Sequence, residues 1–348
     1  MEKTAYRFDL TTAIDEFRQD FPDQKDTITF FDLSKLNLWN RHKLIKHAAQ
    51  QLHNTTQKSE AVFSKFYSNA KSTIKSRNNG AYCLSYDEND LNQASLVIPM
   101  NPESAPKAIE ESYSYRGIVP HSCYDQQPSK HTLYDQLHYL TFDHETGHAV
   151  APFEIRNSKL ETVHINESIA DVYSILRHVK RYGDDTGIID MLKDARVTGA
   201  AAGDLGHYTV PALEAAETYL QTTDISKKSP ADLLSAAIKI SKDASAGFDI
   251  TALGTELDFI DRNDPDMLLN DLFIVNSIIS HKGQETANKD FFNFCQHWFD
   301  AMKGYNRPTE QQEDLLLDNP YFSTTSQNKD MPHMAMPLRR TAPPFQMR

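Results

Sequence analysis

The segment His-Glu-Thr-Gly-His at residues 144–148 constrains the fold of this chain more than any other feature of its sequence. Residues four apart lie on one face of an α-helix, so the imidazoles of His144 and His148 can reach a single tetrahedral ion. Three apolar residues at spacings of four and three lead into this segment, namely Leu133, Leu137 and Leu140. The pattern predicts a buried helix over about residues 131–150, with both histidines on or near its inner face.

The two residues between these histidines that matter most are Glu145 and Gly147. Glu145 would project beside a bound ion, where it can accept a proton from water that the ion activates. Gly147 costs about 1 kcal/mol relative to alanine inside a helix, which predicts that another segment approaches the helix closely there. The alternative is an ordinary helix with two histidines that bind no metal.

A second acidic motif, Asn-Glu-Ser-Ile-Ala-Asp at residues 166–171, leaves 18 residues between His148 and Glu167. A helix is predicted here over residues 159–182. Its apolar stripe consists of Ile165, Ile169, Val172, Ile175, Leu176 and Val179. A carboxylate near such a stripe is costly to bury without a partner, and a metal ion would supply one. Asp171, one turn after Glu167, can hydrogen-bond the free ring nitrogen of a ligating histidine. The alternative is an exposed acidic helix face.

Together the two motifs resemble those of the gluzincins, the zinc peptidases that include thermolysin-like and aminopeptidase-N-like enzymes. The resemblance covers residues 137–176. It implies Zn²⁺ as the cofactor and two lobes with the metal between them. It also implies site roles for five residues: the ligands His144, His148 and Glu167, the general base Glu145, and Asp171 behind a ligand.

A peptidase of this kind needs a group that stabilises the oxyanion of the tetrahedral intermediate. Gluzincins use a histidine or tyrosine from the second lobe. His207, with Tyr208 beside it, is the candidate here, because the glycines of residues 203–206 predict a loop just before a helix. Asp204 can orient His207. Arg196 is a weaker candidate for stabilising the oxyanion. A purely structural role in the loop is the alternative.

The composition favours helices, since only 12 of the 348 residues are glycine and helix-forming residues are plentiful. Helices are predicted over residues 9–21, 34–54, 58–77, 131–150, 159–182, 186–196, 209–222, 229–244, 264–281 and 287–303. Strands are predicted near residues 27–31, 81–86, 95–100 and 116–119. We therefore expect a mainly α (α+β), two-lobed, zincin-like metallopeptidase with a small irregular sheet in the N-terminal lobe and a helical C-terminal lobe.

Three segments are expected along the chain. Residues 1–150 form the N-terminal lobe, which ends in the active-site helix, and residues 151–318 form the helical C-terminal lobe. Residues 319–348, which are punctuated by prolines, form an extended or disordered tail.

The net charge of −12 argues against binding to nucleic acid or to anionic membranes, because both need clustered Lys and Arg. Three widely spaced cysteines predict a reducing compartment rather than a disulfide framework. No apolar run is long enough to insert into a membrane, and the N-terminus has no Sec signal. The expected location is the cytoplasm, or another cell after export as an effector.

The leading functional hypothesis is a zinc-dependent peptidase that acts on a peptide or protein substrate. A metal-dependent hydrolase of a non-peptide amide would use the same residues. A third hypothesis, from a different class, is a helical interaction protein with a vestigial metal site. The sequence does not specify the substrate, endo- or exopeptidase action, or the oligomeric state.

Overall fold

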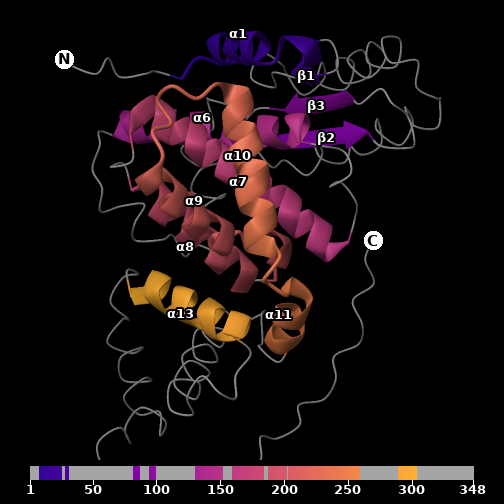
Figure 1. Ribbon diagram of the computed structural model, residues 1–348, viewed down its shortest axis with the longest axis vertical. Coiled ribbons are helices and arrows are strands. Elements are labelled where there is room, and N and C mark those ends of the chain that lie inside the picture. Colours follow the sequence, from indigo (N-terminus) through magenta and orange to yellow (C-terminus); the bar gives the residue numbers. More distant parts are fainter. Residues whose placement is uncertain are drawn as a thin grey trace, which may run out of the picture. The chain divides into compact units, whose positions relative to one another are not determined.

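The structure is a computed structural model that describes residues 8–25, 28–30, 81–86, 94–98, 130–151, 159–183, 187–201, 203–258 and 289–303. Its helices are α1 (Leu10–Asp20), α6 (Lys130–Val150), α7 (Leu160–Tyr182), α8 (Ile188–Ala201), α9 (Val210–Thr222), α10 (Pro230–Ser245), α11 (Ile250–Leu257) and α13 (Lys289–Lys303) (Figure 1). Two short 3-10 turns are η1 (Pro22–Gln24) and η4 (Leu205–His207). The strands are β1 (Ile28–Phe30), β2 (Tyr82–Tyr86) and β3 (Ala94–Ile98).

The predicted α+β class is wrong, because helices make up about 80% of the described residues. The protein is mainly helical, and this finding replaces the two-lobed α+β architecture. The physical reason lies in the core, where packed helices contribute most of the buried apolar side chains. Of the segment expected to form the small irregular sheet, residues 87–93 and 99–119 lie outside the described residues.

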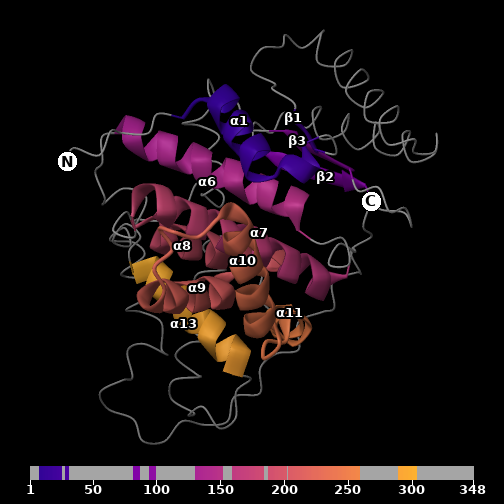
Figure 2. The ribbon, with the colours of Figure 1, turned by 45° about the horizontal axis from the view of Figure 1, so that its top comes forward.

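The three described strands form one small sheet in the order β1-β3-β2. β1 pairs in parallel with β3, with Ile28 opposite Ser95, and β2 pairs antiparallel with β3, with Leu84 opposite Leu96. α6 contacts both β2 and β3, and on another face it packs against α7 (Figure 2). The sheet therefore supports the helix that carries the predicted metal-binding histidines.

Local capping explains where several helices begin and end. Asp9 caps α1 by accepting a hydrogen bond from the Thr12 amide at 2.8 Å, and Pro22 follows its last turn, as a helix-ending residue does. Ser229 and Asp232 form a capping box at the start of α10, which satisfies two otherwise free amides. α7 ends at Tyr182 and is followed by Gly183, whose φ of 97° suits glycine.

The structure confirms six of the predicted helices in type and approximate position: α1, α6, α7, α9, α10 and α13. α8 also forms but runs on to Ala201, five residues beyond its predicted end at 196. The short helix α11 was not predicted. The helices expected over residues 34–54, 58–77 and 264–281 lie outside the described residues.

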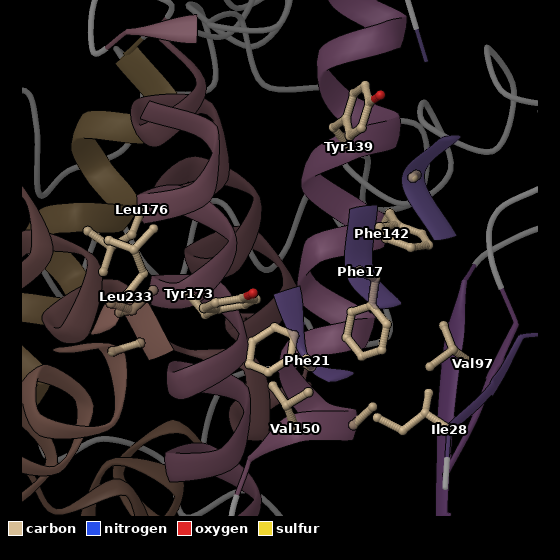
Figure 3. Packing of buried hydrophobic residues seen from close by; sticks show 14 of the residues in the cluster. Phe17, Phe21, Ile28, Val97, Tyr139, Phe142, Val150, Tyr173, Leu176 and Leu233 are labelled. Atoms are coloured by element: carbon tan, nitrogen blue, oxygen red, sulfur yellow. The ribbon is translucent and has the colours of Figure 1, made fainter. Parts of the chain in front are cut away.

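The main hydrophobic cluster joins α1, the sheet and the helix pair α6 and α7. Its labelled members in Figure 3 are Phe17, Phe21, Ile28, Val97, Tyr139, Phe142, Val150, Tyr173, Leu176 and Leu233. Phe17 and Val97 are 3% and 0% exposed, so residues eighty positions apart share one core. This packing sets the position of α6, and burial of such side chains is the main source of stability.

An ion-pair network on the same helices fixes α1 against them. Asp143, which precedes His144 on α6, accepts a hydrogen bond at 2.7 Å from Arg181 on α7. Arg177, one turn earlier on α7, pairs with Asp20 at the end of α1 at 2.8 Å. Asp143 is 3% exposed at its side chain, so its charge needs these guanidinium partners. The network holds α6 and α7 together next to the histidine segment.

Gly147 lies at a close approach of α6 and α7. A Cβ atom at this position would lie 3.1 Å from the Ala170 Cα atom and 3.2 Å from the Tyr173 ring. Both distances are shorter than ordinary van der Waals contact, and one of the atoms belongs to the backbone of α7. The predicted close approach of another segment at Gly147 is therefore confirmed.

Gly147→Ala is expected to destabilise the protein by about 1–3 kcal/mol, because the methyl group would overpack the α6–α7 contact. The matched control is Gly199→Ala in α8, where an added Cβ meets nothing within 4 Å. That control should stabilise the protein by about 0.5–1 kcal/mol through helix propensity. Urea unfolding of both variants measures the difference. Equal effects of the two substitutions would contradict the packing argument.

Burial lowers the pKa of His138 and of His178 to about 4. Between pH 6.5 and 4.5 each histidine takes up a proton in the unfolded chain and stays neutral in the fold, so acidification removes stability. Burial raises the pKa of Glu145, and this shift acts in the opposite direction. A variant comparison therefore isolates the histidine contribution.

His138→Phe keeps a ring against Phe8, whose centroid lies 4.9 Å from that of His138. We expect the variant to lose stability less steeply than wild type from pH 6.5 to 4.5, by about 1 kcal/mol per pH unit. Urea unfolding of both proteins in the presence of a chelator gives the two slopes. Identical slopes would show that His138 is not buried in its neutral form.

All described residues lie within one compact unit, residues 1–307. The predicted boundary after residue 150 adjoins residues 152–158, and the predicted tail begins at 319; neither segment is described, so the domain boundaries stay predictions. Within the described ranges, no helix combines the length and apolar character that crossing a membrane requires.

Candidate metal centre

Three side chains from two helices converge on one point between α6 and α7. His144 Nε2 and His148 Nε2 lie 3.1 Å apart. Glu167 Oε2 lies 3.4 Å from the first and 3.2 Å from the second. Their side chains are only 11–13% exposed. The structure thus brings together the three residues predicted as ligands, and within the described ranges they form a group that can hold a metal ion.

The spacing of these three atoms fits a tetrahedral ion. A zinc ion with bonds of about 2.0–2.1 Å keeps its ligand atoms about 3.3 Å apart, close to the three separations observed here. Glu167 Oε2 is buried and faces three ring nitrogens at 3.1–3.4 Å, those of His144, His148 and His207. Two imidazoles and a carboxylate are also the donor set that zinc accepts, and three protein ligands leave a fourth position open.

Asp171 fixes the orientation of His144 from behind. Its Oδ1 atom lies 2.8 Å from His144 Nδ1, which directs Nε2 towards Glu167 and His148. The Asp171 carboxylate is 1% exposed and also accepts two hydrogen bonds from Arg196, at 2.7 and 2.6 Å. Thr209 donates a further hydrogen bond to it. A histidine ligand held through its second nitrogen by a carboxylate is a common arrangement in zinc sites.

The charged groups of the site shift one another's pKa values. Burial lowers the pKa of His144, but the charge and hydrogen bond of Asp171 and the hydrogen bond of Glu167 outweigh burial and raise it to about 10. Burial raises the pKa of Glu167, yet the neighbouring histidines bring it well below its usual value. Arg196 and His144 likewise lower the pKa of Asp171 against the effect of burial. The two acids therefore stay ionised and hold a proton on His144 in the metal-free protein, so a metal ion would bind here by displacing that proton.

Glu145 lies among these groups without belonging to the ligand triangle. It is 9% exposed, and burial raises the pKa of its carboxyl group, while the charges of His144 and His148 lower it. Glu167 and His207 also interact with it electrostatically. A buried carboxylate with a raised pKa beside a cation site is well suited to transfer protons near neutral pH.

His207 borders the triangle on a more exposed side. Its Nε2 atom lies 3.1 Å from Glu167 Oε2, and its Nδ1 atom lies 2.7 Å from Asp204 Oδ1. The predicted orientation of His207 by Asp204 is therefore confirmed. Burial lowers the pKa of His207, but hydrogen bonds with Asp204 and Glu167 raise it to about 9. Its side chain is 33% exposed, so a molecule arriving from solvent can meet it.

The other two candidates for oxyanion stabilisation, Tyr208 and Arg196, do not reach the ligand triangle. The Tyr208 hydroxyl pairs with His297 Nδ1 of α13 at 2.8 Å, inside a buried aromatic cluster. The structure therefore does not bring this hydroxyl to the ligand triangle. Arg196 is engaged with Asp171. Of the three groups considered from sequence for oxyanion stabilisation, only His207 adjoins the candidate ligands.

Two contributions to the site were missed from sequence: the pairing of Arg196 with Asp171, and the bond from Thr209 to the same carboxylate. Arg196 lies 25 residues and Thr209 lies 38 residues from Asp171. A buried carboxylate generally requires a cationic partner, and this need was the one signal that could have pointed to Arg196. No local pattern marks Thr209.

Comparison with models of protein families gave no match for this chain, and neither curated proteins nor solved structures gave one.

Proposed function

We propose that the protein is a zinc-dependent hydrolase that cleaves amide bonds, with peptides as its substrates. The observation that carries the proposal is the triangle of His144, His148 and Glu167 donor atoms at the separations of a tetrahedral site. Asp171 behind one histidine and Glu145 beside the triangle support it. A purely structural zinc site would have four protein ligands and no need for a buried base.

Zinc bound here would act as a Lewis acid that polarises a carbonyl group and makes water more acidic. Glu145 then accepts a proton from the attacking water as its oxygen bonds to the carbonyl carbon. When the C–N bond breaks, Glu145 passes the proton to the leaving amine. His207, with Nδ1 held by Asp204, donates a hydrogen bond from Nε2 to the oxyanion.

Metal analysis and an activity survey test the proposal together. Protein purified without chelators is expected to contain stoichiometric zinc and to cleave members of a set of internally quenched peptides. A chelator should abolish cleavage, and added Zn²⁺ should restore it. His148→Ala should lose the zinc, whereas His138→Phe, a buried histidine outside the triangle, should keep it. Wild-type protein without zinc would refute the metal site.

The same survey separates the alternatives. Zinc-dependent cleavage of small acyl-amides but of no peptide would select hydrolysis of a non-peptide amide. Zinc binding without any hydrolysis, with biological activity unchanged in Glu145→Gln, would select an interaction protein with a structural metal site. The location in the cytoplasm, or in another cell after export, stays a prediction.

A further inference from the structure

Three consecutive loop residues, 207–209, contact one face of α7. On that face lie His164, Glu167 and Asp171, at spacings of three and four residues. The contacts are His207 Nε2 to Glu167 Oε2 at 3.1 Å, His164 Nε2 to the Tyr208 carbonyl oxygen at 2.9 Å, and the Thr209 hydroxyl to Asp171. The loop is therefore bonded to α7 at each of its three residues.

Close packing also holds the loop just before His207. A Cβ atom at Gly206 would lie 2.8 Å from Val163 Cγ1 of α7, a distance that real Cβ contacts do not reach. Gly206 thus lets the backbone lie directly on the helix. His207 is the next residue, so its side chain projects from a backbone that is held on both sides, by the packing of Gly206 and by the contacts of Tyr208.

The side chain of Tyr208 extends this support to a distant helix. Tyr208 is fully buried, with its ring centroid 5.1 Å from that of Phe294. Its hydroxyl pairs with His297 Nδ1 at 2.8 Å, and His297 Nε2 pairs with Glu214 Oε1 at 3.0 Å. His297 lies on α13, 89 residues after Tyr208. A phenol buried without a partner would be costly, so this chain of hydrogen bonds selects one orientation of the Tyr208 ring.

We propose that Tyr208 is a positioning residue for His207, and that His297 and Glu214 hold it in place from α13 and α9. The inference rests on the proposed function, because Tyr208 affects catalysis only through the hydrogen bond that His207 donates to the oxyanion. Tyr208 has its carbonyl fixed by His164 and its hydroxyl fixed by His297. These two bonds fix the backbone from which the His207 side chain projects towards Glu167. Through Tyr208, α13 controls a group at the metal centre.

Two substitutions at His297 separate its two hydrogen bonds. Asparagine places an amide near the position of Nδ1 and keeps the bond to Tyr208, whereas glutamine places it near Nε2 and keeps the bond to Glu214. Each variant loses one hydrogen bond, so the two should be destabilised to a similar extent. With an internally quenched peptide that wild type cleaves, we expect His297→Gln to lower kcat about tenfold with little change in KM. His297→Asn should retain most of kcat.

A double-mutant cycle with His207→Ala tests whether the effect passes through His207. In the His207→Ala background, His297→Gln should lower kcat no further. An undiminished tenfold loss in that background, or equal kcat in the Asn and Gln variants, would overturn the positioning role. A merely structural role would shift Tm in both variants and leave their kcat values alike.

A measurement on metal-free protein keeps the inference separate from the proposed function. Histidine ¹⁵N NMR can observe the Nδ1 proton of His207 that bonds to Asp204, assigned by its absence in His207→Ala. We expect this signal to persist in His297→Asn and to shift or broaden in His297→Gln. An unchanged signal in His297→Gln would refute the positioning role. Lack of zinc in wild type would refute the proposed function and leave this result standing.

Discussion

Replacement of Glu145 by glutamine is expected to lower kcat by about 10²- to 10⁴-fold, the loss typical of a missing general base. Glutamine has nearly the same shape but cannot accept the proton of the attacking water. Zinc should remain bound, because Glu145 is not one of the three donors of the triangle. The variant therefore separates chemistry from metal binding.

The same substitution lowers kcat but is expected to maintain or raise the stability of the metal-free protein. Burial raises the pKa of Glu145, so its ionised form at neutral pH is costly in the folded metal-free protein. Glu145→Gln should leave the metal-free protein as stable as wild type or more stable, as is common for residues kept for activity. Peptide cleavage, zinc content and urea unfolding measure the three quantities.

The control is Glu161→Gln. Glu161 is an exposed glutamate on the same helix as Glu167, and its side chain contacts Thr251. It should leave kcat and zinc content at wild-type values. Unchanged kcat in Glu145→Gln would remove Glu145 from the mechanism, and loss of zinc in that variant would make Glu145 part of the metal site.

Asp171→Ala is expected to cause the largest loss of stability, about 3–5 kcal/mol. The substitution leaves the guanidinium of Arg196 without the carboxylate that accepts its two hydrogen bonds at 2.6 and 2.7 Å. It also frees the ring of His144, whose Nδ1 atom loses its partner at 2.8 Å. Zinc affinity should therefore fall by about 10- to 100-fold, as it does when such a partner of a ligating histidine is removed.

A double variant separates these two effects. Asp171→Ala combined with Arg196→Met leaves no unpaired buried charge, so part of the lost stability should return. Zinc affinity should stay low, because His144 still lacks its partner. Urea unfolding and competition titration with a chromophoric chelator give the two values. Wild-type zinc affinity in Asp171→Ala would show that Asp171 stabilises the fold without orienting a ligand.

The ligand set was predictable because each of its two motifs is local to one helix. A spacing of four residues puts His144 and His148 on one face of whichever helix contains them, and the same holds for Glu167 and Asp171. The buried stripe that predicted α7 also indicated which carboxylates would need partners. The step from two helices to one site required only that these two faces meet, and Gly147 marked where they do.

The fold class failed as a prediction because the three described strands, although they lie at predicted positions, add few side chains to a core that helices dominate. Residues 28–30, 82–86 and 94–98 pair only through contacts between distant parts of the chain. The eight-residue helix α11 was missed because its local sequence does not favour a helix. Its Gly254 and its β-branched threonines give it low helix propensity, and its packing against α7 favours the helix instead.

By itself, then, the sequence determined the candidate ligands, the base beside them and the two helices that carry them, because each motif depends on spacing within its own helix. Tertiary structure alone decided that Arg196 and Thr209 hold Asp171, that His207 lies against Glu167, and that Tyr208 faces α13. These contacts join residues 25 to 89 positions apart. Such pairs are selected by the packing of whole helices, and that packing leaves no periodic trace along the chain.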